Sequence, residues 1–396
     1  MKLTESKVCI FEYLTDSTWM SCSHINRGLR GLYMSVYKPF EPILIAVSTQ
    51  HFGFLDAIEK IIKYKPKKLV FYDHRLNPSF ILSSLKSSEY PMEELEIIFH
   101  LYGNPAEKLN WWLKAYNASP QSKWQFITSC ESSKVIFESF FKIPPSVLVM
   151  PFPCDEYRES TTNEEFEYLN SQNCIIYSGR ISPDKNVHLL IPFVAKLRKS
   201  DPSLSLILVG PFDDLHNFSI DDNKHSYQLI ISNQIKKYDP DGEFIYYYSK
   251  MSSERLDKLY KKSNYMISLS TLFGEDFGMS IVEAAKNGLC VYLTKWAGYK
   301  DHAKHLHGLN YIDVIVDKSD LTISLPDKLK PTSKMIKSKN IELNSFIYSQ
   351  KYCEGIFKEF FSNKKVKLDL IKISITLSRN VKTMNSEFIK EYNVLW

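Results

Sequence analysis

The sequence predicts an α/β protein built from two doubly wound domains. Short apolar segments of strand length alternate with helical patterns from residue 7 to residue 150, and the same alternation begins again at residue 174. The stretch between the two series, residues 155–173, is polar and acidic, as is typical of a linker between domains. A chain of 396 residues is also longer than one ordinary domain.

The first half of the chain is expected to form one parallel sheet, because each apolar segment is followed by a helical one. Strands are expected at residues 7–14, 43–47, 69–72, 96–99, 124–128 and 146–150. Helices are expected around residues 25–34, at 54–64 and 80–85, and in the segment that ends at Phe140. His100 follows the strand at 96–99 and is therefore expected in its exit loop.

The second half repeats this order. Strands are expected at residues 174–177, 204–209, 244–248, 265–269 and 289–293, with helices at 187–198, 228–235 and 253–261 and another that Ser280 opens. Residues 328–339 are rich in Lys, Pro and Ser and predict a loop. A final helix is expected to pack back on the body, because one helical face carries Val381, Met384, Phe388, Tyr392 and Leu395. The predicted boundaries are thus 1–160 for the first domain, 161–375 for the second and 376–396 for the closing helix.

Charge and cysteine content exclude several classes of protein. The formal net charge is +5, from 50 Lys and Arg against 45 Asp and Glu, which is too small for a dedicated nucleic-acid binder. The seven cysteines are scattered and include no Cys-x-x-Cys pair, so neither a disulfide framework nor a zinc site is expected. The three histidines His302, His305 and His307 also lack the spacing of a zinc site, and a solvated helix end is expected there.

The sequence predicts a cytoplasmic protein. Its first residues do not lead into the apolar core of a signal peptide, and no apolar run approaches the roughly 20 residues needed to span a bilayer. A membrane association would therefore be peripheral, at the inner face of the membrane. Lysines 63, 65, 67 and 68 surround Pro66 and could contact anionic lipid head groups, although a solvated turn is the favoured interpretation.

The glycine-rich segment 273–285 is the first candidate site. It follows the apolar strand at 265–269, and Gly274 and Gly278 allow a tight turn and a close approach of a ligand to the backbone. The start of the next helix leaves N–H groups without partners, which favours an anion such as a pyrophosphate. The carboxylates of Glu275 and Glu283 would repel a phosphate, but they could accept hydrogen bonds from sugar hydroxyls at the two ends of a nucleotide-sugar.

Each feature of this segment also has an explanation without a ligand. Ser280 and Glu283 have the spacing of a capping box, which stabilises a helix start by itself. Glu275 could be a solvated loop carboxylate. Taken alone, the segment does not separate a binding site from a helix cap.

A second candidate element follows the first strand of the second domain. Gly179 permits close approach of a ligand, and Arg180 and Lys185 lie at opposite ends of a short loop from which both cations could reach one diphosphate. The carboxyl ends of parallel strands share one edge of the sheet, so this loop and the segment 273–285 are expected to face the same crevice. The alternative is that both cations are ordinary surface charges.

In combination, these segments resemble the donor domain of the retaining GT-B glycosyltransferases of family 4. The matching residues are Ser178–Gly179–Arg180 with Lys185–Asn186, then 206–210, and then Phe273–Gly278 with Glu283. Segments 127–134 and 147–153 match the end of the family's acceptor domain more weakly, so the resemblance spans roughly residues 96 to 305. It implies the GT-B fold, in which two doubly wound, Rossmann-like domains, the first for the acceptor and the second for the donor, face each other across a cleft.

The resemblance implies a role for each matching residue. Arg180 and Lys185 would hold the donor diphosphate, Glu283 the ribose hydroxyls and Glu275 the transferred sugar. His100 would lie near the reacting sugar. The implied catalytic residues are therefore Glu275, His100, Arg180 and Lys185, and the implied donor-binding residues are Gly179, Arg180, Lys185, Glu275, Phe277, Gly278, Met279, Ser280 and Glu283.

The sequence departs from the family pattern at two places. The Gly-Gly loop that is common after the family's first strand is replaced by residues 15–19. The Pro-Glu pair after a later strand of the family appears here as Lys300–Asp301. Both departures concern the details of the acceptor and of the donor sugar, rather than the class of reaction.

The function that the resemblance implies is the retaining, metal-independent transfer of a sugar from a nucleotide diphosphate sugar, a UDP- or GDP-sugar, without another cofactor. The acceptor would be a hydroxyl of a glycan, a lipid-linked molecule or a protein, in glycan or cell-envelope polysaccharide synthesis. One alternative is a non-catalytic nucleotide-sugar-binding or interaction protein on a GT-B scaffold, which the missing glycine loop favours. Another is a sugar phosphorylase or an enzyme similar to sucrose synthase.

Overall fold

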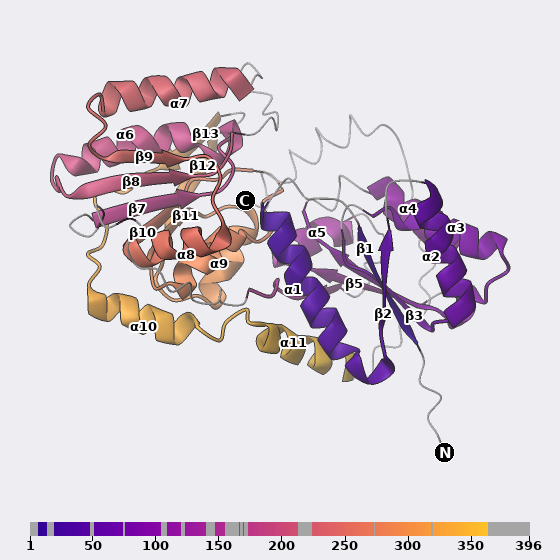
Figure 1. Ribbon diagram of the computed structural model, residues 1–396. Coiled ribbons are helices and arrows are strands. Elements are labelled where there is room, and N and C mark those ends of the chain that lie inside the picture. Colours follow the sequence, from indigo (N-terminus) through magenta and orange to yellow (C-terminus); the bar gives the residue numbers. More distant parts are fainter. Residues whose placement is uncertain are drawn as a thin grey trace. The chain divides into compact units, whose positions relative to one another are not determined.

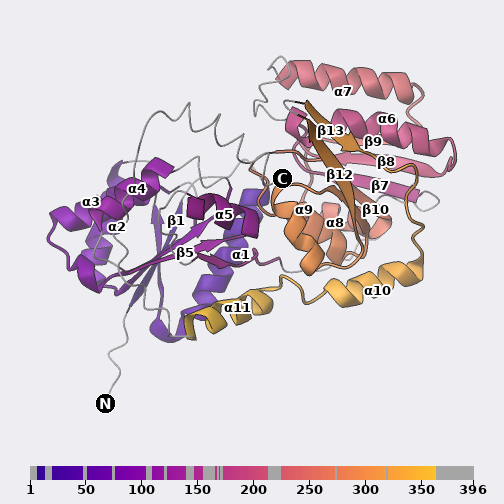
Figure 2. The same ribbon diagram turned by 180° about the vertical axis from the view of Figure 1, so that it is seen from behind.

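The computed structural model divides the chain into two compact units, shown in Figure 1 and, from behind, in Figure 2. One unit consists of Met1–Asp155 with Tyr348–Leu377, and the other of Glu156–Ile347 with Ser378–Trp396. The structure describes residues 7–13, 20–47, 51–73, 76–103, 109–119, 123–139, 147–154, 166, 169, 173–212, 224–272, 274–317 and 320–362.

The first unit is built on a parallel sheet of six strands in the order β2-β1-β3-β4-β5-β6. The strands are β1 Val8–Tyr13, β2 Ile43–Val47, β3 Lys68–Phe71, β4 Glu96–Leu101, β5 Lys123–Thr128 and β6 Val147–Val149. The helices are α1 Met20–Val36, α2 His51–Tyr64, α3 Pro78–Ser87, α4 Leu109–Ala118, α5 Glu131–Ser139 and α11 Gln350–Ser362. Each strand that the sequence predicts for this half is present, because apolar runs buried on both faces are the signature of a covered parallel sheet.

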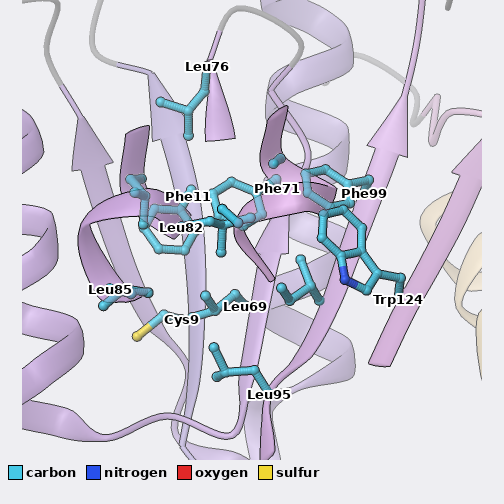
Figure 3. Close-up of a cluster of buried hydrophobic side chains, with 14 of the residues drawn as sticks. Cys9, Phe11, Leu69, Phe71, Leu76, Leu82, Leu85, Leu95, Phe99 and Trp124 are labelled. Carbon is cyan, nitrogen blue, oxygen red and sulfur yellow. The ribbon is translucent and has the colours of Figure 1, made fainter. Parts of the chain in front are cut away.

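Aromatic side chains in neighbouring strands hold the core of this sheet together (Figure 3). Phe11, Phe71 and Phe99 occupy the same level of β1, β3 and β4, and adjacent ring centroids are 4.5 and 5.2 Å apart. Trp124 of β5 stacks on Phe99 at 4.8 Å and donates its indole N–H to the carbonyl oxygen of Ser119. This ladder fixes the register of the strands, and with it the positions of the residues at their carboxyl ends.

Helix α11 packs on α1 within the first unit. Phe357 meets the rings of Tyr33 and Tyr37 edge-on, with centroids 5.8 and 5.9 Å apart, and the backbone N–H of Cys154 donates to the carbonyl oxygen of Tyr348 at 2.6 Å. The sequence-based boundaries place residues 161–375 in the second domain, whereas α11 lies in the first unit. An amphipathic pattern shows that a helix has an apolar face, but it does not show which sheet or helix receives that face. The expected closing helix at 376–396 and the loop at 15–19 lie outside the described residues.

The second unit is built on a sheet of seven strands in the order β13-β12-β11-β10-β7-β8-β9, with β13 antiparallel to β12 and the other neighbours parallel. The strands are β7 Asn173–Ser178, β8 Leu204–Val209, β9 Ile245–Tyr248, β10 Tyr265–Ser268, β11 Cys290–Thr294, β12 Leu309–Asp317 and β13 Asp320–Ser324. Helices α6 Val187–Arg198 and α7 Lys224–Tyr238 lie on one face, and α8 Ser253–Lys262 and α9 Met279–Lys286 on the other (Figure 1, Figure 2).

The segment after β13 differs from the prediction. The sequence predicts a loop at 328–339, but α10 runs from Lys334 to Asn344, and the hydroxyl of Ser333 caps it by accepting from the N–H of Ile336 at 3.2 Å. A search for apolar periodicity does not find this helix, because the face that it turns inward is polar. Among the described residues, no helix is long and apolar enough to cross a membrane.

Candidate active site

Asn186 ties the loop after β7 to the loop after β10. It lies in the left-handed region at φ 52°, and its side-chain amide donates to the carbonyl oxygen of Leu269 at 2.9 Å and to the hydroxyl of Thr271 at 2.8 Å. The N–H of Thr271 donates in return to the carbonyl oxygen of Asp184 at 2.9 Å. β7 and β10 are parallel neighbours, so their exit loops meet at one edge of the sheet.

Lys185 and Glu275 form an ion pair between these two loops. The ammonium of Lys185 donates to Oε2 of Glu275, and both side chains are largely buried, at 11% and 9% exposed. Ser270 completes the group, because its hydroxyl donates to the same carboxylate oxygen at 2.7 Å and accepts from Lys185 Nζ at 3.2 Å. The sequence indicated both charged residues, but it gave no signal for Ser270.

Burial and charge act in opposite directions on Glu275. Burial by itself would raise the pKa of this carboxyl group, but the charges of Lys185 and Arg180 and the hydrogen bonds from Lys185 and Ser270 outweigh it and lower the pKa. Glu275 is therefore ionised at neutral pH. The expected alternative of a solvated loop carboxylate is wrong, since Glu275 is buried.

The loop that carries Glu275 is held by the segment after β11. The N–H of Gly298 donates to the carbonyl oxygen of Glu275 at 2.9 Å, and a Cβ at position 298 would lie 1.8 Å from the carbonyl oxygen of Asp276. The indole N–H of Trp296 donates to the carbonyl oxygen of Leu272 at 3.1 Å. Only glycine fits at position 298 without moving the loop that presents the carboxylate.

His302 supports the same loop. Its Nε2 donates to the carbonyl oxygen of Phe277 at 2.5 Å, its ring is 1% exposed, and burial lowers its pKa to about 4. The expected solvated helix end is therefore wrong for His302, which is a neutral, buried hydrogen-bond donor. Its charged neighbours Lys300, Asp301 and Lys304 resemble those of a surface residue, so the sequence offered no signal for this role.

Helix α9 begins without a side-chain cap. Gly278, at φ 73°, is the N-cap residue and Met279 is the first helical residue, so Ser280 lies inside the first turn. The capping box expected from Ser280 and Glu283 is therefore wrong: Glu283 is buried, and its Oε2 accepts from the hydroxyl of Tyr260 at 3.4 Å. The start of α9 is thus available to an anion in the way that a capped helix is not.

Gly179 and Gly210 bring the ends of β7 and β8 into contact beside Arg180. The N–H of Gly179 donates to the carbonyl oxygen of Val209 at 2.9 Å, and a Cβ at position 210 would lie 1.8 Å from the carbonyl oxygen of Gly179. The carbonyl oxygen of Arg180 accepts from the hydroxyl of Tyr177 at 2.5 Å. The backbone of the Arg180 loop is therefore fixed from two sides.

Gly210→Ala is expected to destabilise the second unit by about 2–4 kcal/mol, because the new methyl group must displace the backbone that carries Arg180. Thermal unfolding of the purified variant measures this effect. Gly355→Ala in α11 is the matched control, since a Cβ there meets no atom within 4 Å and alanine favours a helix by about 1 kcal/mol over glycine. An unfolding temperature of Gly210→Ala equal to that of the unmodified chain would contradict the steric argument.

His100 lies in the first unit, where the structure corrects its expected position. It is inside β4 rather than in the exit loop, because β4 continues to pair with β5 through Leu101. Its ring is 2% exposed, Nδ1 lies 3.0 Å from the hydroxyl of Tyr33, and burial lowers its pKa to about 3. His100 is therefore neutral at physiological pH and packs against Phe152, with ring centroids 5.6 Å apart.

No group of three or more His, Cys, Asp or Glu side chains that could hold a metal ion occurs within the described ranges. In the second unit, Lys185 pairs with Glu275, and Arg180 is near enough to lower the pKa of Glu275. The same loop leads from Glu275 into the uncapped start of α9 at Gly278. Glu283 lies one turn further along α9, against α8. The group has the chemistry expected of a site for an anion that carries hydroxyl groups: two cations, free helix amides and a carboxylate.

Comparison with known proteins gives one family and one fold. Residues 160–322 match the model of the glycosyl transferases group 1 family, whereas no curated protein sequence matches the chain. Anabaena Alr3699/HepE, solved in complex with UDP and glucose, superposes with a TM-score of 0.60 at 14% identity, over 90% of this chain and 99% of that chain.

Two further solved structures have the same fold. Sucrose-phosphate synthase from Thermosynechococcus elongatus superposes with a TM-score of 0.62 at 9% identity, over 90% of this chain and 98% of that chain. A UDP-forming α,α-trehalose-phosphate synthase from Burkholderia xenovorans superposes with a TM-score of 0.59 at 10% identity, over 91% and 99% of the two chains. The GT-B fold class expected from the sequence is confirmed.

Proposed function

We propose that this chain, whose residues 160–322 match the glycosyl transferases group 1 family, belongs to that family and moves a sugar from a nucleotide diphosphate sugar to an acceptor hydroxyl with retention of the anomeric configuration. The observation that carries the proposal is the buried ion pair of Lys185 with Glu275, on a loop that leads into the uncapped start of α9. UDP is the favoured nucleotide, because Anabaena Alr3699/HepE has been solved with UDP-glucose.

Each group in this site has a role in the proposed reaction. Lys185 and Arg180 bind the diphosphate and, with the N–H groups at the start of α9, stabilise the charge that builds on it as the bond to the sugar breaks. Glu275 accepts hydrogen bonds from the transferred sugar, and Glu283 from the ribose. The chain supplies its own cations to the leaving group, so the proposed reaction requires no metal ion.

The acceptor is proposed to bind to the first unit. The acceptor is a hydroxyl of a glycan, a lipid-linked molecule or a protein, and the proposed setting is polysaccharide synthesis at the cytoplasmic face of a membrane. His100 is proposed to act near the reacting sugar. In the free protein this side chain is buried and neutral, so it could accept or donate a hydrogen bond there but would carry no charge.

One observation favours the second candidate, a nucleotide-sugar-binding protein without catalysis. His100 is shielded from solvent, and a residue that takes part in transfer must reach the reacting sugar. The two candidates share the donor site in the second unit and differ in whether the bound sugar is transferred.

Thermal unfolding with UDP-, GDP- and ADP-sugars tests the proposal. A ligand at about 100 times its Kd stabilises the folded state by about 2.7 kcal/mol, so a UDP-sugar is expected to raise Tm clearly. The same mixtures are then assayed for released UDP with candidate acceptors. Release of UDP supports the enzyme. A shift in Tm without any release of UDP, either by transfer or by slow hydrolysis, supports the binding protein. No shift with any of the sugars contradicts both.

A further inference from the structure

The hydroxyl of Tyr33 lies against the buried ring of His100 in the first unit. Oη of Tyr33 is 3.0 Å from Nδ1 of His100, and the two side chains are 0% and 2% exposed. Nε2, the other ring nitrogen of His100, is also buried and has no hydrogen-bond partner among the described residues. One ring nitrogen of His100 is therefore bonded to Tyr33, and the other has no partner in this part of the chain.

The number of unsatisfied groups indicates whether Tyr33 or His100 donates in this bond. Burial lowers the pKa of His100 to about 3, so the ring is neutral and carries one N–H. If Tyr33 donates to Nδ1, the hydrogen of the ring is on Nε2, and this N–H is the single group of the pair without a partner. If Nδ1 donates instead, the O–H of Tyr33 and the lone pair of Nε2 both lack a partner. Each buried polar group without a partner is costly, so donation by Tyr33 is favoured.

Packing holds the hydroxyl of Tyr33 in the position from which it reaches His100. The ring of Tyr33 stacks on those of Tyr37 and Tyr72, with centroids 6.4 and 5.9 Å apart. Phe357 of α11 meets the ring of Tyr33 edge-on, at 5.8 Å. A ring enclosed in this way stays in one orientation, because turning it would displace its neighbours. The contact between Tyr33 and His100 is therefore a fixed feature of the first unit.

His100 is near the edge of the sheet at which a doubly wound domain binds its ligands. It is the last residue but one of β4, and ligands of open parallel sheets lie beyond the carboxyl ends of the strands. A buried N–H without an acceptor is satisfied by a neutral oxygen, such as that of a sugar hydroxyl, which can complete the hydrogen bond. The chemistry of Nε2 in this tautomer is thus that of a donor to a sugar.

We propose that Tyr33 is a positioning residue that holds His100 in the tautomer with its hydrogen on Nε2, so that His100 donates a hydrogen bond to a hydroxyl oxygen of the bound sugar. His100 then does not act as a base, because Nδ1 already accepts from Tyr33 and Nε2 carries a hydrogen. The tautomer is independent of any activity of the chain, whereas the role toward the sugar rests on the proposed function.

Nitrogen NMR of the full chain with isotope-labelled histidine tests the tautomer. The two ring nitrogens of a neutral histidine have well separated shifts, according to which of them carries the hydrogen. The signals of His100 are identified by their loss in His100→Gln, and they are expected to place the hydrogen on Nε2. In Tyr33→Phe, Nδ1 loses its donor, so the two tautomers should mix and the two shifts should move toward each other.

Tyr37→Phe is the matched control for Tyr33→Phe. The hydroxyl of Tyr37 is buried and has no partner among the residues that the structure describes, so its removal should leave both shifts of His100 unchanged. The proposal is overturned if the unmodified chain carries the hydrogen on Nδ1, or if Tyr33→Phe leaves both shifts where they were. The shifts of the unmodified chain decide the direction of the bond whether or not Tyr33→Phe folds, and whether or not the chain transfers a sugar.

Two substitutions of His100 test its role toward the sugar. The amide nitrogen of His100→Gln can replace Nε2 as a donor, whereas His100→Leu removes the donor. With a UDP-sugar and a responsive acceptor, kcat is expected to fall about tenfold in His100→Gln and about a thousandfold in His100→Leu. Equal losses in the two variants would overturn the role as a donor, because a base is lost in both.

Kinetics of Tyr33→Phe connect the tautomer with transfer. In this variant kcat is expected to fall about fivefold, because only part of the molecules then carry the hydrogen on Nε2. Its affinity for UDP should not change, since the proposed donor site is in the second unit. Tyr37→Phe should transfer like the unmodified chain. Normal transfer by Tyr33→Phe with mixed tautomers would overturn the role of His100 as a donor, whereas an unmodified chain that transfers no sugar would refute the proposed function and leave the tautomer to the NMR measurement.

Discussion

Lys185→Ala is expected to lower kcat/KM for sugar transfer about a thousandfold, since it removes the buried cation that is proposed to stabilise the leaving diphosphate. The loss should appear chiefly in kcat, because charge on the diphosphate is greatest in the transition state. Steady-state kinetics with a UDP-sugar and a responsive acceptor measure it. Lys185→Arg is expected to retain part of the activity, since it keeps the charge with a different shape.

Two variants separate catalysis from folding in this experiment. Lys185→Ala leaves the carboxylate of Glu275 buried without its partner, which costs about 3–5 kcal/mol of stability in comparable pairs. The double variant Lys185→Met with Glu275→Gln removes both charges and should recover much of that stability while remaining inactive. Lys196→Ala is the surface control, because its side chain is 64% exposed and pairs only with exposed Asp327 among the described residues. Normal transfer by a folded Lys185→Ala would refute the assignment of the site.

Glu275→Gln is expected to change binding and transfer in opposite directions. In the free protein, Glu275 neutralises Lys185, so a diphosphate must displace a carboxylate from the cation that it needs. Removing that negative charge should tighten the binding of UDP about tenfold, which is roughly 1.4 kcal/mol. Sugar transfer should fall about a hundredfold, because the proposed contact of the carboxylate with the sugar is lost. Titration calorimetry with UDP and kinetics with the UDP-sugar measure the two effects.

The opposite changes in UDP affinity and in sugar transfer distinguish an ion pair that a bound diphosphate displaces from an ion pair that only stabilises the fold. A purely structural pair would lose stability in Glu275→Gln without any gain in affinity for UDP. Glu254→Gln on the exposed side of α8 is a matched control that should change neither quantity. Weaker UDP binding by Glu275→Gln would mean that the pair does not compete with the diphosphate.

Local patterns were sufficient for most of the architecture. Strand β8 is a continuous apolar run, as expected of a strand that is buried on both faces of a sheet, and α6 has apolar residues at helical spacing on its buried face. Both elements have the bounds that the sequence predicts. The candidate donor loops could also be found, because glycines, cations and carboxylates follow strands whose carboxyl ends lie along one edge of a parallel sheet.

Contacts between distant segments could not be read in the same way. Lys185 and Glu275 are separated by 90 positions, and nothing in either loop shows that they pair with each other, or that Ser270 joins them. His302 looks like a surface residue until the fold buries it against the Phe277 carbonyl. The polar contacts of α10 with the second unit and the placement of α11 on α1 were missed for the same reason.

The amino-acid order thus specified which segments are strands, which are helices, and where an anion could meet the second sheet, because those properties depend on neighbours within a few residues. The folded chain specified which charges neutralise each other, which histidines are neutral and which helix receives α11. Those properties depend on burial and on partners that approach from far away in the chain, and a periodic pattern carries information about the face of an element but not about what that face will touch.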